Sequence, residues 1–138
     1  MISLEYMAGF FDGEGCIKIS REKNHSRFTY RLRIGIGQKD RSILIRIKQA
    51  YGGIVVACYD KRYNKTYYEW DTSAQRAFQI LKQIYPYLQL KKLQAKLAIE
   101  FQEIVHNYRK NSRPTEIERI EKFSYYETAK EEMHFLKK

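Results

Sequence analysis

The chain has 138 residues, a length that fits one domain with its own hydrophobic core. Its formal net charge is +10 at pH 7 and its pI is near 9.6, so we expect a polyanionic partner, with nucleic acid first. No apolar run approaches the ~18 residues that span a bilayer, and the N-terminus lacks a signal-peptide pattern. These features argue against a membrane or secreted protein and predict an intracellular one, located in the cytoplasm, the nucleoid or an organelle.

The basic charge is concentrated in the first half of the chain. Between Cys16 and Arg46, nine Lys or Arg residues stand against two acids, a net charge of +7. From Thr115 to Lys138, five basic residues stand against six acidic ones, a net charge of −1. An anionic membrane would favour a basic amphipathic helix, whereas this cluster lies mainly on predicted strands. The distribution favours nucleic acid.

The cysteines and histidines do not have metal-ligand spacing. Cys16 and Cys58 are far apart and form no CxxC pair, which indicates reduced structural thiols. The three histidines, His25, His106 and His134, are equally scattered. A zinc knuckle and a histidine-metal nuclease therefore have little support.

Apolar periodicity predicts a helix and two strands in the first part of the chain, followed by a second helix. Ser3 is a plausible N-cap for the first helix. Asp40 caps the second, which Gly52-Gly53 ends. Strict alternation of apolar and polar residues predicts the two strands between them, at about 16–20 and 30–37.

The same order then recurs. Strands are expected at about 53–60 and 65–72, joined by a polar turn, and Ser73 is expected to cap a helix that stops before Pro86. The unit of strand, strand and helix thus appears twice after one leading helix. It predicts a four-stranded antiparallel, saddle-like sheet with helices on one face.

Two further helices are expected after Pro86, separated by a break at 111–114. The apolar positions of the first are Leu90, Leu93, Leu97, Phe101, Ile104 and Tyr108. Those of the second are Ile117, Ile120, Phe123, Ala129, Met133 and Leu136. The predicted fold class is α+β, as a single domain over 1–138 with a core at about 3–105 and a C-terminal helical extension at about 106–138. The sequence leaves open whether the last helix covers the core or supports a dimer.

The uncovered face of the sheet should present a polar, positive surface. A ribbon of two strands can enter the major groove of DNA, where Arg and Lys read guanine and a carboxylate accepts from cytosine N4. Alternation predicts base-edge candidates on or next to the first, second and fourth strands, namely Lys18, Ser20, Thr29, Arg31, Arg33, Lys65, Tyr67 and Glu69. Phosphate contacts are expected from residues at the hairpin tips, namely Arg21, Lys23, Arg27, Lys61 and Arg62. Lys39 and Arg41, which follow the second strand, are further DNA-binding candidates.

Residues 7–15, Met-Ala-Gly-Phe-Phe-Asp-Gly-Glu-Gly, form the most informative segment. Asp12 and Glu14 lie at a helix C-terminus, where the macrodipole already places negative charge, so a cation is expected there. A hard divalent ion takes carboxylate and carbonyl oxygens together. Gly9 and Gly13 lie on one helix face and allow the close approach of another backbone.

This segment, followed twice by strand, strand and helix, resembles the motif of the LAGLIDADG homing endonucleases. Ala8, Gly9, Asp12 and Gly15 match the motif, and the remaining positions carry mild substitutions, among them Glu14 for Asp. The resemblance covers about residues 3–105 and implies a site-specific endonuclease that makes a metal-dependent double-strand break in a long DNA target and leaves four-base 3′ overhangs.

The resemblance also implies the site residues. Glu14 corresponds to the metal-binding carboxylate, with the carbonyl of Gly13 as a second ligand and Mg2+, or Mn2+, as the ion. Gln38 corresponds to a polar residue near the nucleophilic water. Lys91, in Pro86-Tyr87-Leu88-Gln89-Leu90-Lys91, corresponds to a lysine near the scissile phosphate. Asp12 is expected to form hydrogen bonds at the helix end or helix interface rather than to bind metal.

A single copy of the motif implies a homodimer, since family members with two copies act as pseudosymmetric monomers. The expected dimer interface contains Ala8, Gly9, Asp12 and Gly13, an isologous contact of one helix with its twofold mate. A twofold protein predicts a palindromic or pseudopalindromic target in double-stranded DNA.

Two alternatives remain open from the sequence. An intron RNA maturase of the same fold would keep the basic sheet without needing cleavage, and RNA would then be its partner. A DNA-binding regulator would use the fold without catalysis. The retained pair of Glu14 and Lys91 favours the endonuclease over both.

Overall fold

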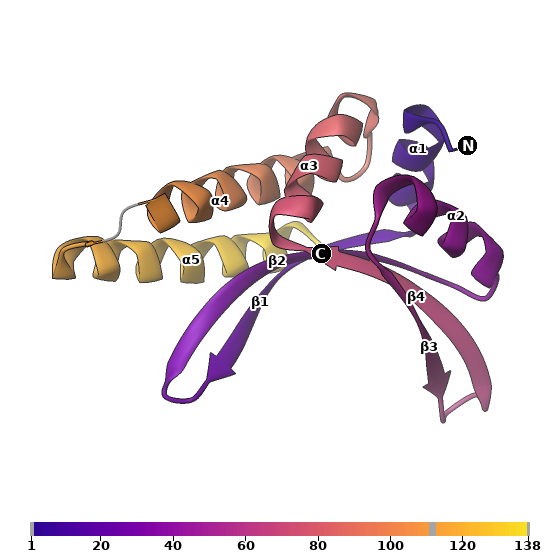
Figure 1. Ribbon diagram of the computed structural model, residues 1–138, viewed down its shortest axis with the longest axis horizontal. Coiled ribbons are helices and arrows are strands. Elements are labelled where there is room, and N and C mark those ends of the chain that lie inside the picture. Colours follow the sequence, from indigo (N-terminus) through magenta and orange to yellow (C-terminus); the bar gives the residue numbers. More distant parts are fainter. Residues whose placement is uncertain (1, 111–112, 138) are drawn as a thin grey trace.

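The computed structural model describes residues 2–110 and 113–137. Figure 1 shows the order of its elements along the chain. The helices are α1 (Leu4–Glu14), α2 (Arg41–Tyr51), α3 (Ala74–Ile84), the 3-10 turn η1 (Tyr85–Tyr87), α4 (Lys92–Lys110) and α5 (Glu116–Leu136). The strands are β1 (Gly15–Asn24), β2 (Arg27–Gln38), β3 (Ile54–Asp60) and β4 (Lys65–Ser73). Within these two ranges, no helix is long and apolar enough to cross a membrane.

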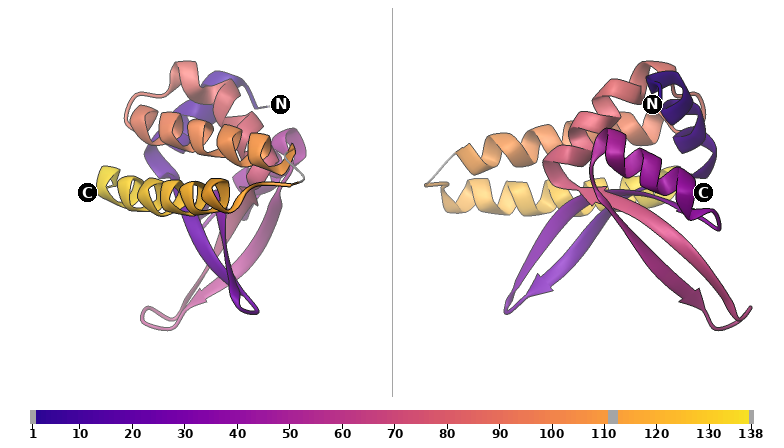
Figure 2. Two further views of the ribbon diagram at one scale, coloured as in Figure 1. Left: turned by 90° about the vertical axis from the view of Figure 1, so that its left-hand side faces the viewer. Right: turned by 45° about the vertical axis from the view of Figure 1, so that its right-hand side comes forward.

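The four strands form one antiparallel sheet in the order β1-β2-β4-β3. The strongly twisted β1–β2 and β4–β3 hairpins diverge as two arms of an arch, with the helices above it (Figures 1 and 2). One face of the sheet is therefore covered and the other is open. The predicted α+β fold, with two strand-strand-helix units after a leading helix, is confirmed.

The core lies between the helices and the covered face of the sheet. Ile17, Leu32, Ile34 and Trp70 project from the strands into this core and are almost fully buried. The indole Nε1 of Trp70 donates to the carbonyl of Gly52 at 2.8 Å, which fixes the end of α2 against β4. The alternating pattern thus predicted correctly which face of the first two strands is buried.

The helix caps agree with the sequence at two of three positions. The side chain of Ser3 accepts from the N–H of Tyr6 at 3.1 Å, and Asp40 Oδ1 accepts from the N–H of Ser42 at 2.8 Å. Ser73 has the expected extended backbone but makes no side-chain cap hydrogen bond. The predicted break at 111–114 falls partly on Asn111 and Ser112, which lie outside the described residues.

The apolar stripe predicted for the helix after Pro86 is largely wrong. Only Leu97 and Phe101 of that stripe are buried, whereas Leu90 and Leu93 are 78% and 67% exposed. The face that packs inward is lined instead by Ala95, Leu97, Ala98, Phe101, Gln102 and Val105. Helix α4 packs against α3, and Ala95 and Ala98 are fully buried although the larger Leu90 and Leu93 nearby are exposed.

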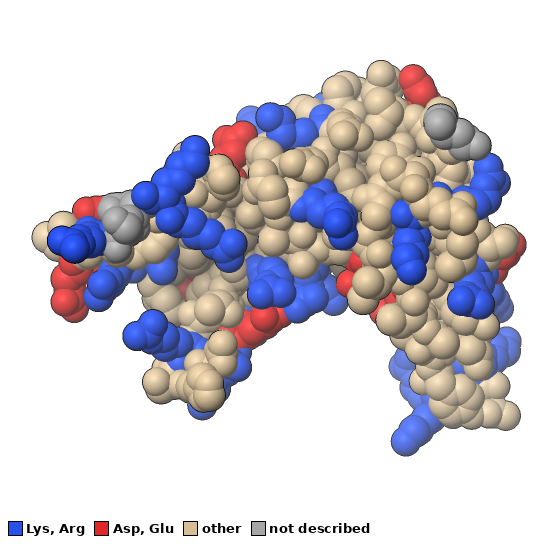
Figure 3. Space-filling view, viewed as in Figure 1, with Lys and Arg blue, Asp and Glu red and all other residues tan. Residues whose placement is uncertain are grey.

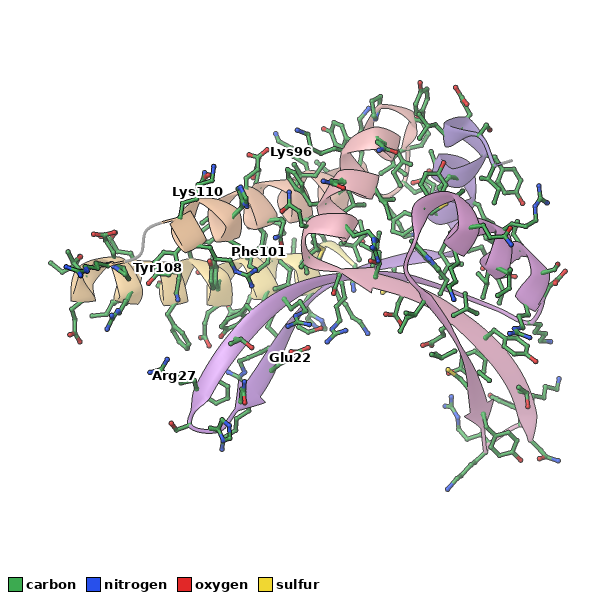
Figure 4. The ribbon with its side chains drawn as sticks, viewed as in Figure 1. Glu22, Arg27, Lys96, Phe101, Tyr108 and Lys110 are labelled. Atoms are coloured by element: carbon green, nitrogen blue, oxygen red, sulfur yellow. The ribbon has the colours of Figure 1, made fainter. Side chains whose placement is uncertain are left out.

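Helix α5 covers the core along β1, one of the two edge strands of the sheet. Burial raises the pKa of Tyr126 to about 12, and its ring contacts Phe101 at 5.1 Å between centroids. Glu127 accepts from the hydroxyl of Tyr30 at 2.6 Å and pairs with Arg21 at 3.4 Å. Figure 4 shows Phe101 between α4 and α5.

The apolar positions predicted for the start of α5 are wrong. Ile117 and Ile120 are 68% and 62% exposed, and Phe123 is 41% exposed. The first turns of α5 lie beside the end of α4, away from the centre of the sheet (Figure 1), so only Tyr126, Ala129 and Met133 are buried.

Replacing Phe101 by alanine should lower the free energy of unfolding by about 3–5 kcal/mol, because a large ring shared by α4 and α5 leaves a cavity. Urea titration followed by circular dichroism measures the change. The control Ile120→Ala, at an exposed position of α5, should change it by less than about 0.5 kcal/mol. Equal effects of the two variants would contradict this description of the core.

Candidate active site

The candidate site lies where α1 ends and passes directly into β1. Gly15, at this junction, must be glycine, because a Cβ there would lie 2.4 Å from the ring of Phe11 and 2.6 Å from its carbonyl oxygen. Phe11 is fully buried, so the ring cannot move away. The tight junction fixes Glu14, the last residue of α1, at the upper end of the open face.

The structure brings Glu14 and Gln38 into direct contact. Gln38 ends β2, and its Nε2 donates to Oε2 of Glu14 at 3.0 Å. Glu14 is exposed, while Gln38 is half-buried. The amide therefore holds one carboxylate oxygen in place and leaves the other free to accept a ligand.

Asp12 is buried and has a structural role within the chain. Its carboxylate accepts from the backbone N–H groups of Gln89, Leu90 and Lys91 at 2.8–3.0 Å. Burial opposes ionisation, but these three hydrogen bonds and the charge of Lys91 prevail and hold the pKa of Asp12 below its ordinary value of 3.8. The expectation that Asp12 forms hydrogen bonds at a helix end agrees with this geometry.

Lys91 supplies a positive charge at the C-terminus of α1. Its Nζ donates to the carbonyl oxygen of Asp12 at 2.7 Å. The C-terminus of α1 thus receives a cation from a residue 79 positions further along the chain. Glu14, Gln38 and Lys91 all lie around this one helix end, and their roles toward metal, water and phosphate stay predictions.

A hollow of about 370 Å³ opens beneath Glu14 on the open face. It is lined by Glu14, Cys16, Lys18, Ser20, Arg33, Ile34, Gly35, Ile36, Gly37, Glu69, Trp70 and Asp71. Gly35 and Gly37 have no side chains to fill it, and a Cβ on Gly35 would lie 3.0 Å from the carbonyl of Trp70. The concave surface between the two arms is therefore partly made by these glycines.

The donor set at this helix end is rich in hard oxygen atoms. Among the residues that the structure describes, no three His, Cys, Asp or Glu side chains lie close enough together to hold a metal ion. One protomer offers the Glu14 carboxylate, with the carbonyl of Gly13 beside it in the chain. These oxygens suit Mg2+ or Mn2+ in kind, but one carboxylate and one carbonyl fill only part of the octahedral coordination that Mg2+ takes.

The two arms differ in the charge of their open faces. Strand register places Lys18 opposite Arg33 and Ser20 opposite Arg31, with Thr29 and Arg27 further toward the tip. Glu22 is the one carboxylate on this face of the β1–β2 arm, and it pairs with Arg33 and with Arg31. The hydrogen bond from Arg33 holds the pKa of Glu22 below its ordinary value. Figure 4 shows Glu22 on the inner side of this arm and Arg27 near its tip.

The β3–β4 arm is not a basic surface, which corrects the expectation that the whole open face is positive. Its open face bears the carboxylates of Asp71, Glu69 and Asp60 but only one lysine, Lys65. Tyr67 lies between Lys65 and Glu69 on the same face. In Figure 3 the β1–β2 arm shows Lys and Arg among uncharged residues, with carboxylates along its inner edge. The visible side of the β3–β4 arm is mostly uncharged, with carboxylates at its upper end and basic residues at its tip and outer edge.

Several predicted DNA contacts lie away from the open face. Arg21 and Lys23 are opposite Tyr30 and Phe28 on the other side of β1, and Arg21 pairs with Glu127 of α5. Lys61 and Arg62 are exposed at the β3–β4 tip, where Arg62 pairs with Asp60. Lys39 and Arg41 are exposed at the start of α2. Period-two alternation already separates Arg21 and Lys23 from Lys18 and Ser20.

The expected interface on α1 is only partly available to a second chain. Ala8 has no exposed surface and packs in the protomer's own core, so its assignment to a dimer interface is wrong. Asp12 is occupied by its backbone partners. Gly9 and Gly13 are exposed, and a Cβ at either position would meet no atom within 4 Å.

A profile of the LAGLIDADG endonuclease family matches residues 7–108. The chain belongs to this family. A search of curated protein sequences finds no match to it.

Solved structures share the LAGLIDADG fold of the chain. The homing endonuclease I-CvuI in complex with its target is 21% identical, at a TM-score of 0.75, over 96% of this chain and 80% of that one. The archaeal intron-encoded homing endonuclease I-Vdi141I complexed with DNA is 17% identical. Its TM-score is 0.77, over 96% of this chain and 82% of that one. The meganuclease I-SmaMI bound to uncleaveable DNA is 17% identical, at 0.70, over 93% of this chain but 43% of that one.

The variant Asp12→Asn should lower the free energy of unfolding by about 1–3 kcal/mol at pH 7, because an amide cannot accept all three N–H groups as a carboxylate does. The pKa of Asp12 is lower in the native state than its ordinary value of 3.8. The ionised carboxylate therefore contributes fully to the free energy of unfolding when the pH is above 3.8, and this contribution disappears as the pH falls through the native pKa. The difference in free energy of unfolding between wild type and Asp12→Asn should therefore become smaller below about pH 4.

Urea titrations at pH 7 and pH 3 measure this difference. The control Glu103→Gln removes an exposed carboxylate from α4 and should have little effect at either pH. A difference for Asp12→Asn that does not change with pH would contradict the role of its charge.

Proposed function

We propose that this protein is a homing endonuclease that, as a homodimer, makes a double-strand break in a long, palindromic or pseudopalindromic DNA site. The observation that carries the proposal is the junction of α1 and β1, where Gln38 holds Glu14 and Lys91 lies beside Asp12. Family membership supports endonuclease chemistry at this junction. A double-strand break with four-base 3′ overhangs is the outcome that the family pattern leads us to expect.

The partner that best fits the open face is double-stranded DNA. A twisted ribbon of two strands fits the major groove, where long cationic side chains reach base edges. Lys18, Arg31 and Arg33 lie side by side on the β1–β2 arm and suit guanine. Arg27 and Lys61 lie at the two tips, where exposed cations suit phosphates.

Each site residue has a distinct task in phosphodiester hydrolysis. Glu14, with the carbonyl of Gly13, would hold a divalent ion, Mg2+ or Mn2+, for which both offer hard oxygen ligands. When bound, such an ion supplies an activated water and a Lewis acid. Gln38 orients the Glu14 carboxylate and can order water near it. Lys91 provides positive charge for the phosphate as negative charge develops.

The homodimer is proposed from the surface of α1. Gly9 and Gly13 leave one side of α1 without bulk, so a second backbone can approach closely. Exposed apolar side chains lie on α1 and on the segment tied to its end by Asp12, namely Tyr6, Leu90 and Leu93. A pair of chains would bring two Glu14 carboxylates together and complete the donor set.

Glu14→Gln should reduce cleavage more than about 100-fold while DNA binding persists, because the amide keeps the size of the side chain but loses the charge that holds a cation. Plasmid libraries with randomised inserts are incubated in Mg2+, and linear products are counted by sequencing their ends. The control Glu5→Gln, in the first turn of the same helix, should cleave like wild type. If the wild-type protein binds DNA but never cleaves it, in Mg2+ or Mn2+, the proposed endonuclease function is wrong and a maturase or regulator is favoured.

Gly9→Leu should convert a dimer to a monomer and abolish cleavage, because an added side chain prevents close approach of the two α1 helices. The protomer itself should fold normally, since a Cβ at position 9 has open space around it. Sedimentation velocity measures the mass. The control Ala50→Leu adds the same bulk at an exposed position of α2 and should remain dimeric. A monomeric wild type that cleaves DNA would contradict the model of two half-sites.

A further inference from the structure

The open face of β3 carries three apolar side chains that the chemistry described so far does not use. Ile54 lies opposite Asp71, Val56 opposite Glu69 and Cys58 opposite Tyr67, which places all three on the open face. The exposed fractions of Ile54 and Val56 are 53% and 41%. We refer to Ile54, Val56 and Cys58 as the β3 strip.

The β3 strip does not belong to the core. Val55, the neighbour that points to the other face, packs against the core cluster, and Trp70 of β4 is fully buried there. The strip therefore faces away from all helices of the described chain. Partial burial and the Glu69 carboxylate raise the pKa of the Cys58 thiol, so this side chain is neutral at pH 7 and continues the apolar surface.

The charges beside the strip indicate which part of a nucleic acid it contacts. Glu69 and Asp71 flank Val56 and Ile54, and carboxylates repel phosphates. They are complementary to the amino groups that cytosine and adenine present in the major groove. Cations on this arm are confined to the tip, at Lys61, Arg62 and Lys65. The arm is thus suited to contact phosphates at its tip and base edges along its length.

We propose that the β3 strip is a recognition site for the C5-methyl groups of thymine, so that each half-site has a thymine-bearing segment beneath β3 and a guanine-bearing segment beneath β1 and β2. This proposal rests on the DNA-binding function proposed above. Thymine is the base that presents an apolar group in the major groove, and apolar side chains contact it there. The strip and the basic β1–β2 face are parts of one continuous sheet surface.

The spacing of the strip sets the spacing of the thymines. Side chains on one face of a strand recur every two residues, about 6.8 Å apart. Base pairs stack about 3.4 Å apart. Ile54, Val56 and Cys58 therefore meet the groove at intervals of about two base pairs. The preferred half-site should contain thymines at alternate positions in this segment.

The test compares thymidine with deoxyuridine, which differs from it only by the missing C5-methyl group of the base. Wild-type protein first selects bound duplexes from a randomised library in Ca2+. Each selected thymine is then replaced singly by deoxyuridine, and binding is measured by fluorescence anisotropy. One buried methyl group should be worth about a three- to five-fold change in Kd. In Val56→Ala, binding should become insensitive to deoxyuridine at one thymine position of the DNA site and stay sensitive at the others. In Ile54→Ala, the insensitive position should lie about two base pairs from the one affected by Val56→Ala.

The control Thr66→Ala truncates a β-branched side chain on the opposite face of the same hairpin and should retain the full sensitivity. Equal sensitivity to deoxyuridine in wild type and Val56→Ala would overturn the proposed role of the β3 strip, and so would a wild type that is insensitive at every position. Neither result would contradict the proposed endonuclease function. A change of oligomeric state in Val56→Ala without any effect of deoxyuridine would identify the strip as a protein contact and also overturn the proposal. Wild-type protein that binds no DNA would overturn the proposed function and the strip with it.

Discussion

The carboxylate of Asp12 is the constraint on which the site depends. It accepts three consecutive backbone N–H groups, those of Gln89, Leu90 and Lys91, immediately before α4 begins. These N–H groups belong to the segment that leads into α4, so one buried anion joins the end of α1 to the chain just before α4. Because Lys91 belongs to the captured segment, the same contact brings its ammonium group to the carbonyl of Asp12.

The two acids of α1 differ because the helix directs them to different surroundings. Residues two apart are turned by about 200° around a helix axis, so Asp12 and Glu14 face nearly opposite sides. Asp12 meets the segment before α4 and is buried, whereas Glu14 meets the end of β2 and stays exposed. One acid therefore fixes the backbone and the other remains available as a ligand, although their sequence context is almost the same.

The sequence predicted the layout of the sheet well and the helical layer less well. Strict alternation in β1 and β2 identifies the buried face, because successive side chains of a strand point to opposite faces of the sheet. In α4 several helical stripes are possible, and the packed one uses Ala95 and Ala98 instead of the larger Leu93, while Leu90 precedes the helix. Hydrophobicity alone favours the larger residues, while close packing favours the smaller ones. The contact between Asp12 and Leu90 spans 78 positions in the chain, and no local pattern indicates it.

The difference between the two arms shows how charge and shape divide the tasks of the open face. A uniformly basic saddle would bind any duplex tightly, because phosphate contacts carry no sequence information. In this chain the cations of β1 and β2 are opposed by Glu69 and Asp71 across Gly35 and Gly37, at the centre of the sheet. Phosphates placed near these carboxylates raise the free energy of a complex unless a cation or a base amino group compensates. The acids thus oppose binding to arbitrary DNA, and in the complex proposed above the favourable energy would come from base edges and from a cation held by Glu14.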